Sequence, residues 1–185
     1  MKVLKTPFEG LLIIEPQIFE DARGRFFESY NKTLFSQAAA AVDFVQDNEN
    51  YSAFGVIRGL HYQKPPYAQA KLMRVASGTI YDVTVDLRFN SPTFGKYFGL
   101  ELSAKNNKQL FIPRGFAHGM AVISKGGAQV FYKCDNFYNP QSEGGIIFND
   151  KTLSINWQIE IKEAILSSKD LMLPSFAEYK NNPCF

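Results

Sequence analysis

In the stretch KLMRVASGTIYDVTVDL, residues 71–87, two runs rich in apolar and β-branched residues flank a short turn. The runs cover Lys71 to Ala76 and Thr79 to Leu87, and the turn is Ala76-Ser77-Gly78. Runs of this length and composition, bounded by turn residues, are typical of β-strands. The stretch therefore predicts two strands and indicates a β-rich fold.

The same pattern recurs along the chain. Further strands are predicted at Phe8 to Glu15, Gly24 to Tyr30, Ser52 to Gln63, Tyr97 to Leu102, Gln109 to Ile112, Ala117 to Ile123 and Ala128 to Asp135. Helical signal is confined to a segment capped by Asn31, through Thr33–Phe35 and Ala38–Ala41, and to a loop with a short helix at 159–170. We expect one all-β domain spanning residues 1–185, a β-sandwich or barrel of the jelly-roll kind with a few short peripheral helices.

Composition narrows the classes of function. Of the 185 residues 45% are hydrophobic, enough for a full core, and a net charge of +2 leaves no basic patch for nucleic acid. No apolar run approaches the roughly 18–20 residues of a membrane helix, and the N-terminus lacks a signal-peptide stretch. Two cysteines are too few for a disulfide framework. We therefore expect a cytoplasmic protein that binds neither nucleic acid nor membrane.

Motifs for common cofactors are missing. The sequence has no Gly-x-Gly-x-x-Gly, no P-loop and no βαβ alternation around its glycines. Its only two histidines, His61 and His118, have no second His or Cys at metal-ligand spacing, so a metal held by both would need carboxylates from elsewhere. We expect no metal and no cofactor.

The densest cluster of chemically active side chains lies in Gly55-Val-Ile-Arg-Gly-Leu-His-Tyr-Gln63. Strict strand alternation places Arg58 and His61 on opposite faces. Gly59 lies between them and suits a bulge, which would bring both side chains to one cavity. The alternative for His61 is a structural imidazole between strands.

Polar side chains also interrupt the predicted strands of residues 71–87. Lys71 shares a face with Met73 and Val75, so its ammonium either reaches the rim of the sheet or points into a cavity. On the other predicted strand, one face carries Asp82, Thr84 and Asp86. This face is either exposed to solvent or lines the polar interior of a barrel.

Three further segments add candidates. His118 lies among glycines, where a backbone can approach a ligand closely. Tyr132 and Tyr138 are six residues apart and serve either packing or a site. Arg23 would form a phosphate clamp with Arg58 and Lys71 if the fold brings the three together.

In combination these segments resemble the dTDP-4-dehydrorhamnose 3,5-epimerase family, cupin-type jelly rolls that act on nucleotide-linked 4-keto-6-deoxy sugars. The resemblance runs from Asp21 to Pro174. Its motifs are Asp21-x-Arg-Gly-x-Phe-x-Glu28, Gln46-Asp-Asn48, Arg58-Gly-Leu-His-Tyr-Gln63, Asp82-Val-Thr-Val-Asp-Leu-Arg88, Ser91-Pro-Thr93, Ile112-Pro-Arg-Gly-Phe-Ala-His118, Tyr132-Lys133, Glu143-Gly144 and Leu166-Ser-Ser-Lys-Asp170. So many matches in the same order are highly specific.

The resemblance implies a role for each matched residue. His61 is similar to the family's base and Asp170 to the carboxylate that orients it, while Tyr132 matches the proton donor on the opposite face and Lys71 the cation beside the keto oxygen. Substrate-binding positions fall on Arg23, Phe26, Glu28, Gln46, Asp47, Asn48, Arg58, His118, Tyr138, Glu143 and Lys169. The residues alone leave Asp82 and Asp86 open as partners of His61. The resemblance also implies a homodimer that needs no metal or cofactor.

The reaction that the resemblance implies is inversion of C3 and C5 of dTDP-4-keto-6-deoxy-D-glucose, giving dTDP-4-dehydro-L-rhamnose for dTDP-L-rhamnose biosynthesis. The sequence leaves open a C3-only epimerase and an enzyme for another nucleotide sugar, such as a GDP-keto-heptose. A metal-dependent cupin and a non-catalytic sugar-binding jelly roll are alternatives of other classes. Asn50 and Tyr51 stand where a more Ser- and Lys-rich stretch is common in the family, which bears on the exact substrate.

Overall fold

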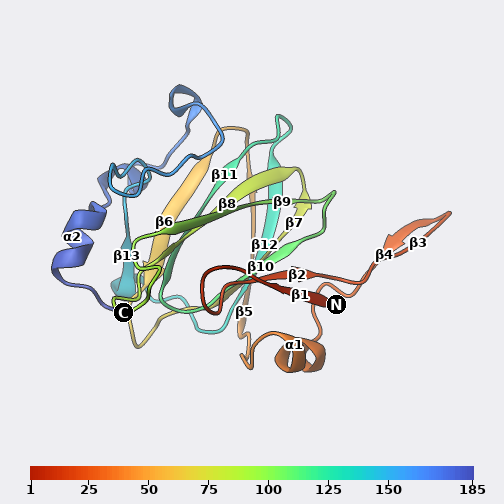
Figure 1. Ribbon diagram of the computed structural model, residues 1–185. Coiled ribbons are helices and arrows are strands. Elements are labelled where there is room, and N and C mark those ends of the chain that lie inside the picture. The colour runs from red at the N-terminus through yellow and green to blue at the C-terminus, as the bar shows by residue number, and fades with distance from the viewer.

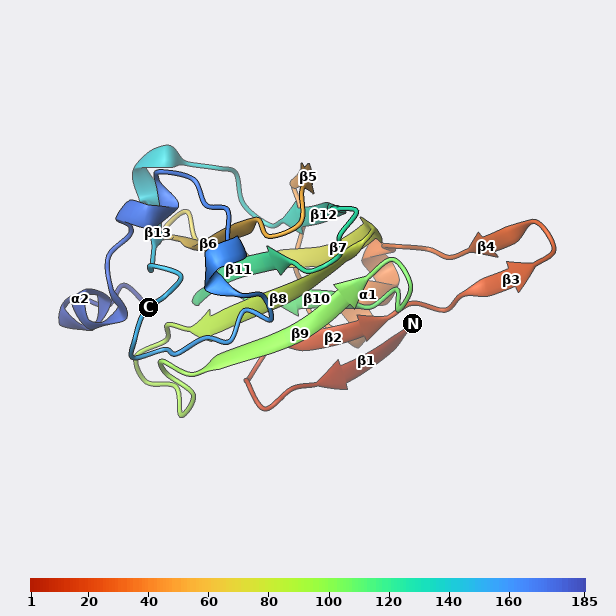
Figure 2. The same cartoon turned by 90° about the horizontal axis from the view of Figure 1, so that it is seen from above.

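The computed structural model describes all 185 residues, and two antiparallel sheets packed face to face form its body (Figures 1 and 2). The first sheet has the order β1 (Lys2–Lys5), β2 (Leu12–Glu15), β10 (Gln109–Ile112), β7 (Lys71–Ser77), β12 (Ala128–Cys134) and β5 (Gln46–Ser52). The second has the order β13 (Glu143–Gly145), β6 (Ile57–Gln63), β11 (Phe116–Val122), β8 (Thr79–Asp86) and β9 (Tyr97–Ser103). The predicted jelly-roll architecture is confirmed.

The remaining elements are short and peripheral. They are a hairpin of β3 (Phe19–Asp21) and β4 (Gly24–Phe26), the helices α1 (Lys32–Ala38) and α2 (Phe176–Asn181), and the 3₁₀ turns η1 (Pro140–Ser142), η2 (Ile161–Glu163) and η3 (Asp170–Met172). Both figures show the β3–β4 hairpin extending away from the body, at the end opposite α2. All six residues of its strands are exposed, so the hairpin has no packing partner within the chain.

Apolar side chains arrange the molecule in layers. One cluster, which includes Met73, Ile80 and Val122, fills the space between the sheets. A second cluster around Trp157 covers the outer face of the β6–β11–β8 sheet, and a third around Phe35 of α1 covers the outer face of the other sheet. The inward-facing side chains of both sheets, polar ones included, share the space between the sheets.

Six predicted strands agree with the structure to within one residue at each end, namely β7 to β12. Their apolar and β-branched residues pack in the core and turn residues bound each run, which is why the local pattern was sufficient. The two runs of residues 71–87 do not pair with each other, since β7 belongs to one sheet and β8 to the other. The turn between them carries the chain across the sandwich.

The largest error concerns β5. We predicted a strand from Ser52 to Gln63, whereas the structure has β5 ending at Ser52 and β6 beginning at Ile57. The β5 sequence, Gln-Asp-Asn-Glu-Asn-Tyr-Ser, lacks the apolar alternation that identifies a strand. It forms at an edge of the sheet by pairing along its whole length with β12, with Gln46 opposite Cys134 and Ser52 opposite Ala128.

Smaller errors lie near the chain ends. The strand predicted from Phe8 begins only at Leu12, the strand predicted through Tyr30 ends at Phe26, and the helix that Asn31 caps ends at Ala38. β1 and α2 were not predicted. A signal for α2 was present, because Ser175 and Glu178 form a capping box at its start.

Candidate active site

Two cavities of about 440 and 280 Å³ lie between the sheets. The larger has a mixed lining of apolar side chains with Arg58 and His118, whereas the smaller is lined mainly by polar side chains of β5, β6 and β12 and of neighbouring segments. The residues that line both are His61, Lys71 and Tyr132. Three of the predicted catalytic side chains therefore meet where the two cavities adjoin.

His61 on β6 pairs with Asp170 at the start of η3, with 2.6 Å between Nε2 and Oδ1. The carboxylate accepts a hydrogen bond from Nε2–H, which leaves Nδ1 as the basic nitrogen. Burial lowers the pKa of His61, and the Asp170 carboxylate offsets this only in part. The imidazole is therefore neutral near pH 7, the form that a base requires.

The open choice among three carboxylates is resolved by geometry. Asp170 contacts His61, whereas Asp82 contacts His118 and Asp86 accepts hydrogen bonds from Arg88. Asp82, Thr84 and Asp86 are fully buried, so their face of β8 looks into the interior rather than into solvent.

Gly59 brings Arg58 and His61 to the same cavity, as predicted. The register between β6 and β11 shifts opposite Gly59, and both side chains line the larger cavity. Gly59 has a φ of +118°, and a Cβ there would lie 2.6 Å from the Cα of Gly119. Only glycine fits a bulge of this shape.

Tyr132 and Lys71 face His61 from the opposite sheet. They lie on the neighbouring strands β12 and β7, and the Lys71 Nζ is 5.9 Å from the centroid of the Tyr132 ring. Burial raises the pKa of Tyr132, so that its hydroxyl keeps its proton. Burial lowers the pKa of Lys71, which takes part in none of the ion pairs of the chain.

A second buried pair lies beside the first. The Nε2 of His118 is 3.0 and 3.1 Å from the two carboxylate oxygens of Asp82, and His118 stands opposite His61 in the β11–β6 register. His118 lines the larger cavity, so the two His–Asp pairs share one wall of the site.

Predicted binding residues form a hydrogen-bonded group around the smaller cavity. Glu143 accepts a hydrogen bond from the Tyr138 hydroxyl at 3.0 Å and pairs with the Lys169 ammonium at 2.5 Å. Gln46 accepts from the backbone N–H of Tyr138 and donates to Asn48 at 2.9 Å. These contacts fix the side chains before any ligand is bound.

Four predicted binding residues do not reach the cavities within this chain. Arg23 and Phe26 lie on the projecting hairpin, where Arg23 pairs with Asp21 and Phe26 is 68% exposed. Glu28 follows the hairpin and is exposed. Successive side chains of β5 point to opposite faces of the sheet. Asp47 therefore points away from both cavities, and it pairs with Lys133. The phosphate clamp of Arg23, Arg58 and Lys71 is therefore not assembled in a single chain.

Cys134 is a lining residue that we did not predict. It lies on the inward face of β12 two residues after Tyr132, directly opposite Lys71. Burial raises the pKa of its thiol to about 11, so it stays protonated. Strand alternation from Tyr132 was the signal that could have identified it.

No group of three or more His, Cys, Asp or Glu side chains is close enough together to hold a metal ion. No helix is long and apolar enough to cross a membrane.

Known proteins resemble this chain along almost its whole length. Residues 5–178 match the family described as dTDP-4-dehydrorhamnose 3,5-epimerase. The Shigella flexneri enzyme of that name is 48% identical over 179 residues, which are 96% of this chain and 97% of that protein. The crystal structure of the Elizabethkingia anophelis enzyme has a TM-score of 0.90 at 52% identity and covers 96% of this chain and 97% of its own. The Bacillus anthracis enzyme, solved with TDP and pyrophosphate bound, has a TM-score of 0.91 at 47% identity, with coverages of 95% and 99%. The resemblance predicted from the motifs is confirmed, and this chain belongs to the dTDP-4-dehydrorhamnose 3,5-epimerase family.

Proposed function

We propose that the chain inverts C3 and C5 of dTDP-4-keto-6-deoxy-D-glucose and so produces dTDP-4-dehydro-L-rhamnose, a step of dTDP-L-rhamnose biosynthesis. The observation that carries the proposal is the placement of two side chains around one cavity. A neutral histidine, paired with the Asp170 carboxylate, and a protonated tyrosine face each other from opposite sheets. A base and an acid on opposite faces of a sugar ring are what inversion at carbon requires.

His61 acts as the base. The ketone at C4 acidifies the hydrogens at C3 and C5, because the carbanion left behind delocalises onto the C4 oxygen as an enolate. The Nδ1 of His61 takes the proton, and Asp170 holds the tautomer and stabilises the imidazolium that forms.

Lys71 and Tyr132 complete the step. The Lys71 ammonium has no carboxylate partner, so its charge is available to the developing enolate oxygen. The Tyr132 hydroxyl then returns a proton to the carbon from the face opposite His61. Each inversion moves one proton onto the enzyme and another back, with no change of oxidation state.

The nucleotide diphosphate is assigned to the larger cavity. Lys169 and Arg58 bring positive charge to the larger cavity, and the amides of Gln46 and Asn48 line the smaller one. The bound TDP and pyrophosphate of the Bacillus anthracis relative support a nucleotide ligand.

We include a homodimer in the proposal. The exposed hairpin with Arg23 and Phe26, together with Glu28, has the length and chemistry to reach the cavities of a second chain, and the edge strand β5 has a free side. Two free cysteines agree with a reducing compartment, so we place the enzyme in the cytoplasm.

The proposal is tested by NMR of dTDP-4-keto-6-deoxyglucose with the purified protein in D₂O. Deuterium and inverted configuration at both C3 and C5 are expected. Inversion at C3 alone would identify a mono-epimerase, and no exchange at either carbon would exclude this substrate. Activity should survive chelation, and loss of activity on chelation would favour a metal-dependent cupin instead.

A further inference from the structure

Two successive inversions pose a problem of proton balance. After the first inversion His61 holds an extra proton as imidazolium, and Tyr132 has lost one as phenolate. The second inversion needs a neutral His61 and a protonated Tyr132 again. The site is therefore ready for the second inversion only after one proton has left His61 and one has reached Tyr132.

Lys71 lies beside Tyr132 and faces His61 across the site. Besides His61 and Tyr132 it is the residue that lines both cavities. Its partner in the β7–β12 register is Cys134, two residues from Tyr132, so the Lys71 and Tyr132 side chains are diagonal neighbours on one face. No ion pair holds its ammonium, which ends a flexible four-carbon stem and lies 5.9 Å from the centroid of the Tyr132 ring.

We propose that Lys71 returns the proton from His61 to Tyr132 between the two inversions. This step rests on the proposed epimerase function. The Lys71 ammonium gives a proton to the Tyr132 phenolate, and the neutral amine then takes the proton of the His61 imidazolium. The N–H bond of Lys71 and that of His61 break, one O–H bond and one N–H bond form, and the site regains its starting charge.

The proton affinities favour this direction. Burial lowers the pKa of His61 and raises that of Tyr132, so the proton moves from the more acidic group to the more basic one. Burial also lowers the pKa of Lys71, which makes its ammonium easier to deprotonate.

Neighbouring groups are poorer carriers. The Arg58 guanidinium does not release a proton in proteins. His118 is held by Asp82 on the same sheet as His61. The Cys134 thiol, with a pKa of about 11, is a weaker acid than the lowered Lys71 ammonium.

The test separates the charge of Lys71 from its ability to transfer a proton. Lys71→Arg keeps a cation that cannot deprotonate, and Lys71→Met removes both properties. Inversion and deuterium uptake at C3 and C5 are followed by NMR in D₂O, and binding of dTDP verifies folding. We expect Lys71→Arg to carry out one inversion while the second slows by roughly 10²-fold relative to the first, so that a singly inverted sugar accumulates. Lys71→Met should be slow at both carbons. A Lys71→Arg enzyme with the wild-type ratio of the two rates would overturn the proposal.

A second variant decides the matter if arginine disturbs the cavity and Lys71→Arg is inactive at both carbons. Lys71→Ala is then supplied with methylammonium or guanidinium, of which only the first releases a proton readily. Restoration of both inversions by methylammonium, and of one by guanidinium, supports the relay. Equal restoration by both cations, or by neither, overturns it. Failure of the epimerase proposal itself would differ, because the wild-type protein would then invert neither carbon.

Discussion

Burial acts in opposite directions on the two residues that exchange protons with the sugar. It lowers the pKa of His61 because the charged form is the imidazolium, and it raises the pKa of Tyr132 because the charged form is the phenolate. One low-dielectric cavity thus prepares a base and an acid at the same pH. Asp170 affects the pKa of His61 and not that of Tyr132, because its carboxylate contacts only His61 of the two.

Removal of the base tests its role directly. His61→Ala should lose about 10²–10⁴-fold in turnover while it still binds dTDP, because the substitution removes the group that takes the proton from the sugar carbon. Turnover and dTDP affinity are measured on the same preparation. Lys64→Ala, at an exposed position just after β6, is the control and should keep wild-type turnover. Near-normal turnover of His61→Ala would refute the assignment.

The pH dependence follows from the same shift. Because the pKa of His61 lies below its ordinary value of 6.5, the rate should stay high at pH 6.5 and fall only as the pH drops through the lowered value. Asp170 raises the pKa of His61, so Asp170→Asn should move this acid limb to still lower pH besides reducing the rate. Profiles of kcat/KM against pH measure both effects. An acid limb that shifts upward in Asp170→Asn would contradict the pairing.

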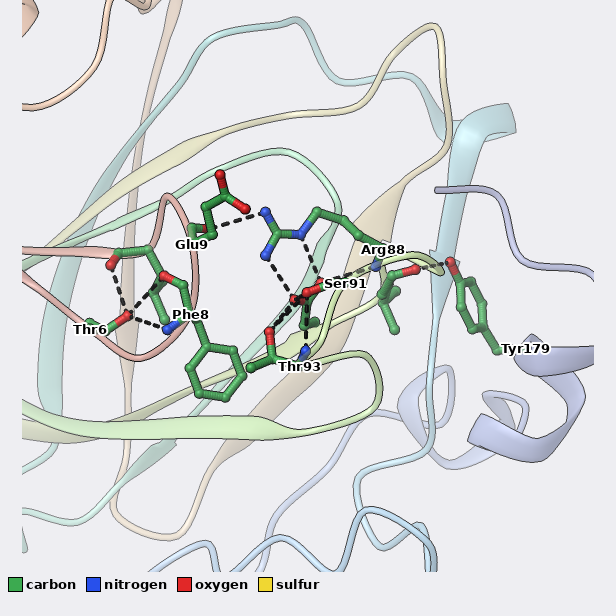
Figure 3. A network of polar contacts seen from close by, with 10 residues as sticks. Thr6, Phe8, Glu9, Arg88, Ser91, Thr93 and Tyr179 are labelled. Atoms are coloured by element: carbon green, nitrogen blue, oxygen red, sulfur yellow. Dashed lines mark hydrogen bonds and ion pairs between the residues drawn. The ribbon is translucent and has the colours of Figure 1, made fainter.

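At the scale of elements, the end of β8 is fixed by a buried carboxylate. Asp86 accepts hydrogen bonds from the Arg88 backbone and guanidinium and from the hydroxyls of Ser91 and Thr93. Arg88 in turn donates to the carbonyl of Glu9 at 3.0 Å, and the Tyr179 hydroxyl of α2 donates to Leu87 at 2.9 Å (Figure 3). The network joins the β1–β2 loop, the β8–β9 turn and α2.

Loss of Asp86 should therefore destabilise the fold. Asp86→Ala leaves Arg88 and two hydroxyls without their acceptor, and we expect the free energy of unfolding to fall by roughly 3–5 kcal/mol. Burial would raise the Asp86 pKa, but its hydrogen bonds outweigh burial and hold the pKa below 3.8. The contribution of Asp86 to the free energy of unfolding is therefore present above pH 3.8. It is lost as the pH falls through the lowered pKa of Asp86.

Denaturant unfolding measures this loss. Asp21→Ala is the matched control, because Asp21 also pairs with an arginine two residues later but both side chains are exposed, so the free energy of unfolding should hardly change. Equal effects of the two substitutions would mean that the Asp86 network adds no stability.

At the scale of the whole molecule, the site and the residues assigned to it do not coincide in one chain. His61, Lys71 and Tyr132 lie between the sheets, whereas Arg23 and Phe26 lie on a hairpin that extends from the body (Figure 2). A second copy of the chain would supply both the surface that the hairpin lacks and the residues that the cavity lacks.

Mixing of two inactive variants tests this arrangement. A chain with Arg23→Ala and Phe26→Ala and a chain with His61→Ala should each have low activity. After unfolding and refolding together, about a quarter of the wild-type activity per chain should return, since half the dimers are mixed and each of these has one intact site. The control mixes His61→Ala with Tyr132→Phe, which places both lesions in the cavity and should restore nothing. Absence of restoration in the first mixture would show that the hairpin serves its own chain or none.

The sequence determined those strands and helices whose own residues form a recognisable pattern of apolar, turn and capping residues. β7 to β12 are runs rich in apolar residues and bounded by turn residues, and Asn31 caps α1 through the backbone N–H of Leu34 at 3.2 Å. Gly59 marked the bulge that lets Arg58 and His61 share a cavity. The ordered motifs identified the family, because they collect residues that the site uses together.

Only the tertiary structure decided what depends on contacts between distant segments. His61 and Asp170 are 109 residues apart in the chain, so no local pattern could choose Asp170 over Asp82 or Asp86. β5 forms because β12 pairs with it, although its own residues are polar. The orientation of Asp47 and the position of Lys71 and Tyr132 opposite His61 likewise follow from packing two sheets together. Local propensity fixes the period of each strand, and burial between the sheets fixes which side chains meet and in what state of charge.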